Sequence, residues 1–258
     1  MCIRDSNHPV ISYIVVTYNS QIHFPELINN LNRCTPLDHE IIIIDNNSDD
    51  KEYLSPYKVI YNKDNTYFTS AVNQGLKLID NNSEYIILIN PDVRINKNTV
   101  EKLISDTQKL NAGIAGSILL RSNLSVQHAG GQKYDTKDIN PLELTSHQHL
   151  HDKDKLRTII NNYPKKVQWV TGALLLITKK ALKVLGELDE SYNHYKSDLE
   201  YCLRANDEKI NVICSSSIAL HFHKKSSKSK KGKLNFFFTK LKYYLARKYF
   251  ELIMNLKK

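Results

Sequence analysis

The chain has 258 residues, of which 41% are hydrophobic, and this composition is that of a globular protein with one large domain or two small ones. No stretch reaches the roughly eighteen consecutive apolar residues that a membrane-spanning helix needs, and the start, MCIRDSNHPV, lacks the apolar centre of a signal peptide. The net charge of +9 comes from a lysine-rich C-terminal segment with one acidic residue, Glu251, so the basic character belongs to a tail and not to the fold.

Predicted strands and helices alternate along the first half of the chain. Residues 10–20, VISYIVVTYNS, are a short β-branched run that ends in polar residues and predicts a buried strand. In chain order there follow a helix at 21–34, strands at 39–50 and 57–65, a helix at 69–80, a strand at 84–93, a helix at 97–110 and a strand at 112–120. Thr69 or Ser70 is the predicted N-cap of the second helix. Because the strands are apolar throughout instead of alternating, we expect an α/β fold, with a mostly parallel sheet covered by helices on both faces.

Polar side chains gather where three of these strands end. They are Thr17, Tyr18, Asn19, Asp45, Asn46, Asn90 and Asp92. In open sheets of this kind, ligands bind beyond the carboxyl ends of the strands, so we expect these residues to share one binding edge. Asp92, which follows the apolar run in LINPDV, is either an ordinary turn residue or a group that holds a ligand at that edge.

The second half of the chain is less regular. Residues 121–165 are polar, broken by glycine and proline and weakly periodic, so we interpret them as an insert. A strand followed by a helix is predicted at 166–186, then a helix at 198–210 and an extended segment at 211–223. The predicted organisation is an unstructured leader at 1–9, one domain at 10–223 and a basic helical tail at 224–258.

The motifs present exclude some nucleotide chemistry. The chain has neither GxGxxG nor GxxxxGK[ST], and only eight glycines, so a dehydrogenase-type dinucleotide fold and a P-loop kinase are poorly supported. The four cysteines have no close-paired spacing, which argues against a zinc site or a disulfide framework and favours a reducing cytosol. A nucleotide can still bind through carboxylates and a metal. Asp92 with a distant histidine can coordinate Mg²⁺ or Mn²⁺, cations that also take phosphate oxygens.

Seven segments, in order from about residue 10 to about residue 226, resemble the family 2 glycosyltransferases, which have the GT-A fold. They read VVTYNS, EIIIIDNNSDD, NKDNTYFTSAVNQGL, YIILINPDV, WVTGALLLITKKAL, LDESYNHYKSDLEYCLRA and ALHFHKKS. One such segment alone is a weak signal, whereas seven at the family spacing are specific. The subgroup that they resemble most contains the rhamnosyltransferase-like and galactofuranosyltransferase-like enzymes, whose metal motif often reads N-P-D.

The resemblance implies roles for individual positions. Residues implied in donor and nucleotide binding are Thr17, Tyr18, Asn19, Asp45, Asn73 and Asn90. Asp92 and His221 are implied as ligands of a divalent cation, Mg²⁺ or Mn²⁺, and Asp198 as the catalytic base. Trp169, Thr171 and Gly172 match the segment that lines the donor and acceptor pocket. The donor-binding half of the domain is then about 10–120, and the acceptor and catalytic half is 166–223.

These roles imply an inverting transfer from a nucleoside-diphosphate sugar, with a dTDP- or UDP-sugar favoured. The acceptor hydroxyl attacks the anomeric carbon opposite the leaving diphosphate, and it needs a base within hydrogen-bond reach. The transition state is oxocarbenium-like, so stabilising the leaving group matters as much as the base. The implied acceptor is a saccharide or a lipid-linked saccharide, in surface polysaccharide biosynthesis.

Two positions depart from the family pattern. The family often has Glu directly before the catalytic Asp, where this chain has Ser197, so we retain Asp198 without a carboxylate pair. The family often has Gly in N-x-G-F, where this chain has Tyr67 before Phe68. The second change alters the donor loop and can alter the preferred nucleotide or sugar.

Several assignments have a structural alternative. Asp45 with the two asparagines after it, read alone, is a loop with Asx turns, and Asp198 can be the N-cap of the helix that follows. Trp169 can be a core residue. Glu200 either holds the acceptor or is a solvated acid in the first turn of the helix, and the sequence does not separate these two.

The remaining histidines and cysteines are weighed in the same way. His221 and His223 share a strand face, and the spacing favours His221 as the metal ligand. His147, His149 and His151 alternate, but a polar stretch of the insert explains them better than a metal site. Cys202 and Cys214 are interpreted as buried packing residues.

The tail has a solvated basic linker at 224–233 and then, from Leu234, aromatic and aliphatic residues mixed with Lys and Arg at helical spacing. This composition fits an interfacial helix at 234–258 attracted to an anionic membrane surface, or a helix packed on the catalytic domain with a solvated basic face. We favour the membrane, because acceptors in this family are often lipid-linked. The expected location is therefore cytoplasmic, peripheral at the inner face of the cell membrane, with no specific nucleic-acid partner.

Two other functions compete with glycosyl transfer. A sugar nucleotidyltransferase usually has a Gly-rich phosphate loop near the first strand, and VVTYNSQIHF has none. A non-enzymatic binder of nucleic acid or membrane could act through the basic tail alone. That alternative leaves the aligned polar and acidic strand ends unexplained.

Overall fold

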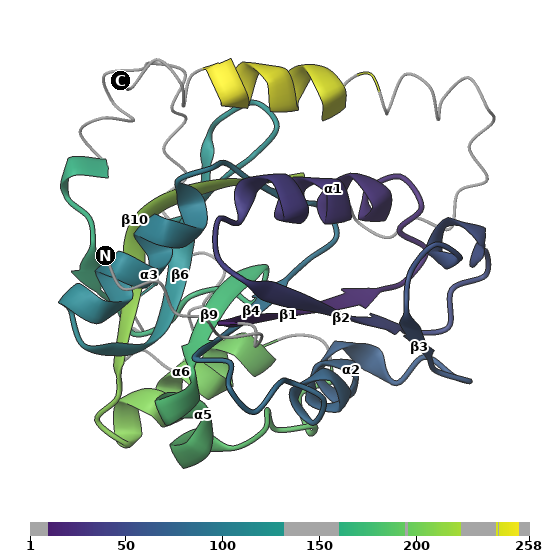
Figure 1. Cartoon of the computed structure of the whole chain (residues 1–258). Coiled ribbons are helices and arrows are strands. Elements are labelled where there is room, and N and C mark those ends of the chain that lie inside the picture. The colour runs from purple at the N-terminus through teal and green to yellow at the C-terminus, as the bar shows by residue number, and fades with distance from the viewer. Residues whose placement is uncertain (1–9, 132–159, 194–195, 223–240, 242, 253–258) are drawn as a thin grey trace, which may run out of the picture.

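The computed structural model describes residues 10–131, 160–193, 196–222, 241 and 243–252, and it shows a central sheet with helices on both faces (Figure 1). Some predicted features lie outside these residues. They are the leader at 1–9, residues 132–159 of the insert with its three alternating histidines, His223 and the basic linker.

The predicted strands and helices appear in the predicted order, together with short elements that were not predicted. They are β1 (Ile11–Thr17), α1 (Phe24–Cys34), β2 (His39–Asp45), the short 3-10 helix η1 (Glu52–Leu54), β3 (Val59–Tyr61), α2 (Tyr67–Leu76), β4 (Tyr85–Ile89), β5 (Val93–Ile95), α3 (Thr99–Lys109), β6 (Ala112–Leu120), β7 (Val126–His128), β8 (Lys165–Lys166), β9 (Leu174–Thr178), α5 (Lys179–Leu185), α6 (Ser197–Asp207) and β10 (Asn211–His221). A further helix, here called the C-terminal helix, covers residues 243–252.

One mixed sheet forms the centre of the molecule. Its strand order is β3-β2-β1-β4-β9-β6-β10-β5, with β7 paired to β6 and β8 paired to β10. The first four strands are parallel to one another. β9 runs antiparallel to both of its neighbours, β4 and β6. The expected parallel character is thus concentrated in the first half of the chain, where the predicted donor residues lie.

Both faces of the sheet are buried, and this explains the continuous apolar runs. On one face, Tyr13 and Val15 of β1 pack in the same core cluster as the buried side chains of α1 and α3. On the other face, Ile14 packs with α2, α5 and α6. Successive strand residues point to opposite faces, so each strand covered on both sides is apolar throughout.

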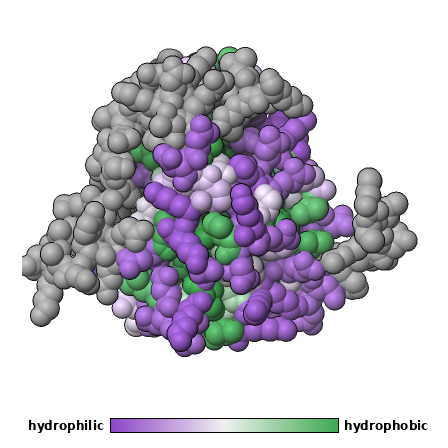
Figure 2. All heavy atoms as spheres, turned by 90° about the vertical axis from the view of Figure 1, so that its left-hand side faces the viewer, coloured by the Kyte–Doolittle hydropathy of each residue, from purple (hydrophilic) through white to green (hydrophobic). Residues whose placement is uncertain are grey.

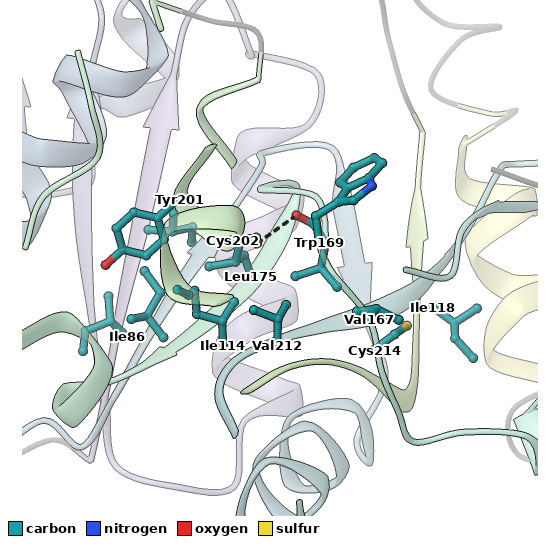
Figure 3. Packing of buried hydrophobic residues seen from close by; sticks show 14 of the residues in the cluster. Ile86, Ile114, Ile118, Val167, Trp169, Leu175, Tyr201, Cys202, Val212 and Cys214 are labelled. Carbon is teal, nitrogen blue, oxygen red and sulfur yellow. Dashed lines mark hydrogen bonds between the residues drawn. The ribbon is translucent and has the colours of Figure 1, made fainter. Parts of the chain in front are cut away.

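The core under α6 is dense and contains the two cysteines of the second half (Figure 3). Cys202 and Cys214 are fully buried and unpaired, which confirms their predicted packing role. Burial raises the pKa of both thiols well above the usual range, so neither is a nucleophile. Trp169 lies in the same cluster, and a Cβ added at Gly131 would come within 2.0 Å of the indole nitrogen. Gly131 therefore makes the room that the indole occupies.

The start of α2 differs from the prediction. The helix begins at Tyr67 with Thr66 as its cap residue, so the assignment of Thr69 or Ser70 as N-cap was wrong. The Thr69 hydroxyl instead donates to the backbone carbonyls of Tyr192 and Asn193, in the segment that leads to α6. The Thr69 hydroxyl thus bonds a segment that is distant in the sequence and does not cap its own helix.

Strand β10 carries His221 at its end and is irregular in its middle. Its pairing with β6 shifts register between Cys214 and Ile218. The Ser216 backbone N–H and the hydroxyls of Ser215 and Ser216 donate to Asp106 Oδ2 of α3, at 2.7 to 2.9 Å. This carboxylate satisfies polar groups that the irregular pairing would otherwise leave buried without a partner.

Candidate active site

The predicted polar residues of β1 and β2 do lie at one edge of the sheet. Thr17 pairs with Asp45 at the carboxyl ends of the two parallel strands. The backbone N–H of Asn46 then donates to the Thr17 carbonyl at 2.8 Å, which extends the contact past the strands. β4 lies on the other side of β1, so the segment Asn90 to Asp92 leaves the sheet at the same edge.

Tyr53, which the sequence analysis did not single out, connects the loops that follow β1 and β2. The Tyr53 hydroxyl, from η1, lies 3.0 Å from the Thr17 hydroxyl and 3.1 Å from that of Ser48, and it accepts from the Ser20 backbone N–H at 3.2 Å. Asp45 is fully buried, and both of its carboxylate oxygens accept from Ser48, one from the hydroxyl at 2.5 Å and one from the backbone N–H at 3.1 Å. In this structure Asp45 and Thr17 therefore hold the shape of the two loops.

Asn46 is the hub of the next loop. It is buried, and its Oδ1 accepts from the Thr66 backbone N–H at 2.9 Å and from Asn62 at 3.2 Å. Its Nδ2 donates to Asn65 at 2.9 Å and to the Tyr67 carbonyl at 3.0 Å. One amide thus fixes the segment between β3 and α2, the predicted donor loop.

Two other predicted donor residues, Tyr18 and Asn19, directly follow β1. Tyr18 is 39% exposed and presents its ring at the strand edge. Asn19 has a left-handed backbone (φ 49°), and its side chain exchanges two hydrogen bonds with Asp49, at 2.9 and 3.0 Å. Tyr67 also has a left-handed backbone (φ 62°), at the position where the family pattern often has glycine.

The two predicted metal ligands meet, although 129 positions separate them in the sequence. Asp92 Oδ1 lies 3.3 Å from His221 Nε2, and the two side chains are 14% and 7% exposed. The other ring nitrogen of His221, Nδ1, lies 2.9 Å from Gln127 Oε1 of β7. Because an amide oxygen only accepts, this contact suits a proton on Nδ1. Nε2 then faces the carboxylate, where a bound cation could take its lone pair. Gln127 fell inside the predicted insert, and nothing in the sequence pointed to it.

A buried arginine holds the turn that carries Asp92. Arg94 donates through Nη1 to the carbonyls of Pro91 and Val93, at 2.9 and 2.6 Å, and through Nη2 to the His23 carbonyl at 2.9 Å. The backbone N–H of Phe222 donates to the Asp92 carbonyl at 3.1 Å. Burial lowers the pKa of Arg94 to about 10, and the charges of Glu26 and Asp92 oppose that shift, so the guanidinium stays charged at neutral pH.

The predicted base is linked to the same edge through the start of β9. The Asn90 backbone N–H donates to the Ala173 carbonyl at 3.0 Å. Gly172, the residue before, donates its N–H to Asp198 Oδ2 at 2.7 Å. Asp198 is in the first turn of α6, one residue inside the helix, and is half-buried. A Cβ at Gly172 would make ordinary van der Waals contact with that of Asp198, at 3.4 Å, so the two residues are direct neighbours.

Three other predicted site residues have structural contacts. Both atoms of the Asn73 amide bond the backbone of Leu188, and Nδ2 also donates to Glu190 at 2.9 Å. Glu200 forms a two-pronged ion pair with Arg204, at 2.8 and 3.2 Å. Trp169 is 5% exposed and lies in the core. Their predicted ligand roles remain predictions, and the structure adds a packing or positioning role to each.

The residues at the strand edge fit a divalent cation that is shared with a substrate. The described residues contain no cluster of three or more His, Cys, Asp or Glu side chains, and among them Asp92 and His221 are the pair that could hold the cation. A carboxylate and an imidazole nitrogen suit Mn²⁺ and, through oxygen, Mg²⁺. Cations held by few protein groups usually complete their shell with substrate phosphates and water.

A family model described as glycosyl transferase family 2 matches residues 12–184, about two thirds of the chain. The chain therefore belongs to glycosyl transferase family 2, as the seven sequence segments indicated. Curated relatives agree with this. The low-salt glycan biosynthesis hexosyltransferase Agl10 of Haloferax volcanii is 24% identical over 222 residues, which cover 82% of this chain and 66% of that protein. The O-antigen biosynthesis protein RfbC of Myxococcus xanthus is 23% identical over 85% of this chain, but over only 18% of its own length.

Solved structures show the same fold. GalNAc-T7, crystallised with UDP, GalNAc and Mn²⁺, matches with a TM-score of 0.67 at 16% identity, over 92% of this chain and 48% of its own. The mannosyltransferase PcManGT of Pyrobaculum calidifontis, in complex with GDP-Man and Mn²⁺, matches with a TM-score of 0.59 at 14% identity, over 86% of this chain and 59% of its own. These matches confirm the predicted GT-A type of α/β fold, in a chain that spans about half to two thirds of most of these relatives.

Proposed function

We propose that the protein is a metal-dependent, inverting hexosyltransferase that moves a sugar from a nucleoside-diphosphate sugar to a hydroxyl group. The observation that carries the proposal is the pair of Asp92 and His221, 3.3 Å apart at the edge where the strand ends meet. The same edge is linked through Asn90, Ala173 and Gly172 to Asp198. Asp92 and His221, which could hold the cation of a diphosphate, and Asp198, which could take a proton, are thus connected through the backbone of Asn90, Ala173 and Gly172.

The cation side of the site serves the leaving group. Asp92 and His221 would hold Mg²⁺ or Mn²⁺, which would neutralise the charge of the departing diphosphate. Arg94 keeps the Asp92 turn in place, and Gln127 holds the imidazole at Nδ1, which leaves Nε2 toward Asp92. Tyr18, Asn19 and Asn90 are the predicted donor residues with surface at this edge, and the buried Thr17, Asp45 and Asn73 shape the loops around it.

The base side of the site serves the acceptor. Each oxygen of Asp198 accepts one backbone N–H, from Gly172 at 2.7 Å and from Leu199 at 2.9 Å. A carboxylate has about four acceptor positions, so it retains capacity for the hydroxyl of an acceptor. Asp198 takes the proton as that hydroxyl attacks the anomeric carbon. The residue directly before it is the buried Ser197 and not the glutamate that the family often has. Asp198 therefore acts without a carboxylate directly before it.

The finer assignments follow the family resemblance. We propose a dTDP- or UDP-sugar donor of the rhamnosyl or galactofuranosyl kind and a saccharide or lipid-linked saccharide acceptor, in surface polysaccharide synthesis. The name of Agl10 refers to glycan biosynthesis and that of RfbC to O-antigen biosynthesis, which supports this setting. The ligands of the solved neighbours, UDP with GalNAc and GDP-Man, support a nucleotide-sugar donor in general.

A thermal-shift screen tests the proposal most directly. The purified chain is heated with dTDP, UDP, GDP or CMP, each with and without Mn²⁺, because a ligand that binds the native state raises its melting temperature. We expect a shift with one nucleoside diphosphate that requires metal and that is lost in Asp92→Ala. Asp198→Asn should keep this shift and lose about a hundredfold or more in transfer rate, as expected for a general base. A metal-independent shift, or an Asp198→Asn enzyme that is fully active, would refute the assignment.

A further inference from the structure

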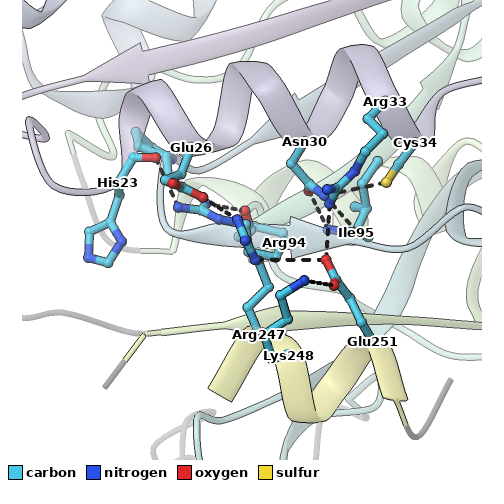
Figure 4. Close-up of polar contacts among 12 residues, drawn as sticks. His23, Glu26, Asn30, Arg33, Cys34, Arg94, Ile95, Arg247, Lys248 and Glu251 are labelled. Atoms are coloured by element: carbon cyan, nitrogen blue, oxygen red, sulfur yellow. Dashed lines mark hydrogen bonds and ion pairs between the residues drawn. The ribbon is translucent and has the colours of Figure 1, made fainter. Parts of the chain in front are cut away.

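The C-terminal helix is docked on the catalytic domain through its charged side chains. It lies along α1 at the top of Figure 1 and in the lower part of Figure 4. Glu251 pairs with Arg33 of α1 at 3.0 Å, and Arg247 pairs with Glu26 of the same helix. Phe250, on the same side, is 1% exposed. The charges that a surface helix usually turns to water are here turned toward the protein.

The first turn of this helix lies beside the candidate metal residues. The ring of Tyr243 is 4.6 Å from that of His23 and 4.4 Å from that of Phe222, centroid to centroid. Phe222 in turn donates its backbone N–H to the Asp92 carbonyl. Burial raises the pKa of Tyr243, and the negative charge of Asp92 adds to that shift. The helix and the active-site edge are therefore parts of one packed region.

The outer face of the helix is apolar. Its exposed large hydrophobic side chains are Leu241, Tyr244, Leu245, Tyr249 and Leu252, each 41 to 57% exposed. Their spacing of three or four residues places them on one side of a helix, opposite Tyr243 and Phe250. They are five of the thirteen exposed large hydrophobic side chains in the described part of the chain. On the face shown in Figure 2, by contrast, hydrophobic side chains are scattered among hydrophilic ones.

The composition of the segment that carries this face indicates its partner. Residues 224–258 contain twelve Lys and Arg residues and one acidic residue, while the rest of the chain is close to neutral. Two copies of so basic a segment would repel each other, and a nucleic acid would leave the leucines exposed to water. An anionic lipid surface satisfies both features, because its headgroups attract the lysines and its acyl boundary takes the apolar side chains. None of the described helices is both long and apolar enough to cross a bilayer.

We propose that Leu241, Tyr244, Leu245, Tyr249 and Leu252 form a membrane-binding face that lies in the plane of an anionic bilayer. Lys248 lies between Tyr244 and Leu252 on this face, with its Nζ 3.5 Å from Glu251 Oε2. Its stem would lie along the bilayer, with the ammonium group at the level of the headgroups. The ion pairs with α1 hold the catalytic domain against the surface. If the proposed function is correct, the membrane then lies next to Asp92, and the acceptor is a lipid-linked saccharide that reaches the site from the bilayer.

Vesicle sedimentation with the full chain tests this face. The probes are phosphatidylcholine vesicles with and without phosphatidylglycerol, at low and high NaCl. The test variant is Leu245→Glu with Tyr249→Glu, two side chains for which the structure shows no polar contact in the described chain. The matched control is Leu78→Glu with Val184→Glu, which are 50% and 56% exposed on other parts of the molecule. A third variant replaces the six lysines of residues 224–233 with glutamine.

We expect the chain to bind the anionic vesicles and to be released by high salt. The face variant should lose at least about tenfold in vesicle partitioning, because two exposed apolar side chains that would enter the bilayer become charged, and the control variant should bind like the native chain. The lysine variant should bind more weakly and with a smaller salt effect. All variants should keep the native melting temperature.

Three results would overturn the proposal. They are equal binding by the face variant and the native chain, equal binding to vesicles without phosphatidylglycerol, and no binding to either vesicle. A single-stranded RNA serves as a second probe. If the native chain and the face variant bind this RNA and only the lysine variant does not, the tail is a nucleic-acid binder instead. The assay needs neither nucleotide nor metal, so vesicle binding and the nucleotide screen can fail independently of each other.

Discussion

Gln127 gives the sharpest test of the candidate metal site, because its contact was not predictable from the family motifs. Its Oε1 accepts from His221 Nδ1 at 2.9 Å. Replacing it with leucine keeps the size of the side chain and removes the acceptor. The imidazole then loses the group that fixes its tautomer and its rotation. Partners of this kind typically contribute about ten- to hundredfold in metal affinity, or about 1.4 to 2.7 kcal/mol.

The effect on stability should be much smaller than the effect on metal binding. The contact is one partly buried hydrogen bond between two side chains, and its removal costs about 1 kcal/mol of unfolding free energy. Gln108 offers a matched control, since its Nε2 donates to the Tyr85 hydroxyl at 2.8 Å, in a different part of the molecule. Gln108→Leu should lower stability by a similar amount and leave metal binding unchanged. Gln127→Glu keeps an acceptor at the same place and should bind metal at least as well as the native chain.

Free Mn²⁺ can be followed by electron paramagnetic resonance while the metal is titrated into protein with a fixed excess of UDP. We expect an affinity loss in Gln127→Leu, and a complete loss in Asp92→Ala and in His221→Ala. Equal Mn²⁺ affinity in Gln127→Leu and Gln108→Leu would refute the orienting role. Unchanged affinity in Asp92→Ala would refute the site itself.

Three further changes test other parts of the structure. Tyr67→Gly relieves a left-handed backbone and should leave the unfolding free energy unchanged or raise it by up to about 1 kcal/mol in urea denaturation, whereas a clear loss would mean that the ring packs on the fold. Asn46→Ala removes a buried amide that bonds four residues of the donor loop, and we expect a loss of about 2 kcal/mol together with weaker nucleotide binding by calorimetry. Burial lowers the pKa of His128 from 6.5 to about 4, so the unfolded chain gains a proton in this range before the folded chain does. Stability should be complete above about pH 6.5 and fall by about 1.4 kcal/mol per unit toward pH 4, and His128→Gln should show a flatter slope.

The sequence was sufficient for the fold of the first half and for the edge where the site lies. Apolar runs such as EIIIID encode strands buried on both faces, and the polar residue after each run marks its carboxyl end. The direction of β9 could not be predicted in the same way, because an apolar run is identical in parallel and antiparallel pairing. Its position between β4 and β6 depends on contacts across more than 50 residues of chain.

Side chains that act through another residue were the ones that the sequence could not reveal. Tyr53 and Gln127 belong to short elements in segments with weak periodicity, and each reaches its partner only in the folded chain. The tail shows the same limit. Its pattern predicts an amphipathic helix but not which face turns inward. The charges of Glu26 and Arg33 on α1 decide that, since they bind Arg247 and Glu251 and leave the apolar face outside.

The burial of the predicted donor residues separates two kinds of contribution that a sequence motif does not distinguish. Thr17, Asp45 and Asn73 are at most 2% exposed, and their polar atoms bond other parts of the protein. Tyr18 and Asp198 retain accessible surface at the strand edge. Substitution of the first three should therefore lower stability and nucleotide affinity together, because the loops lose their shape. Substitution of the second pair should change ligand binding or transfer while the melting temperature stays the same. A motif residue can thus be required for activity and still never touch the substrate.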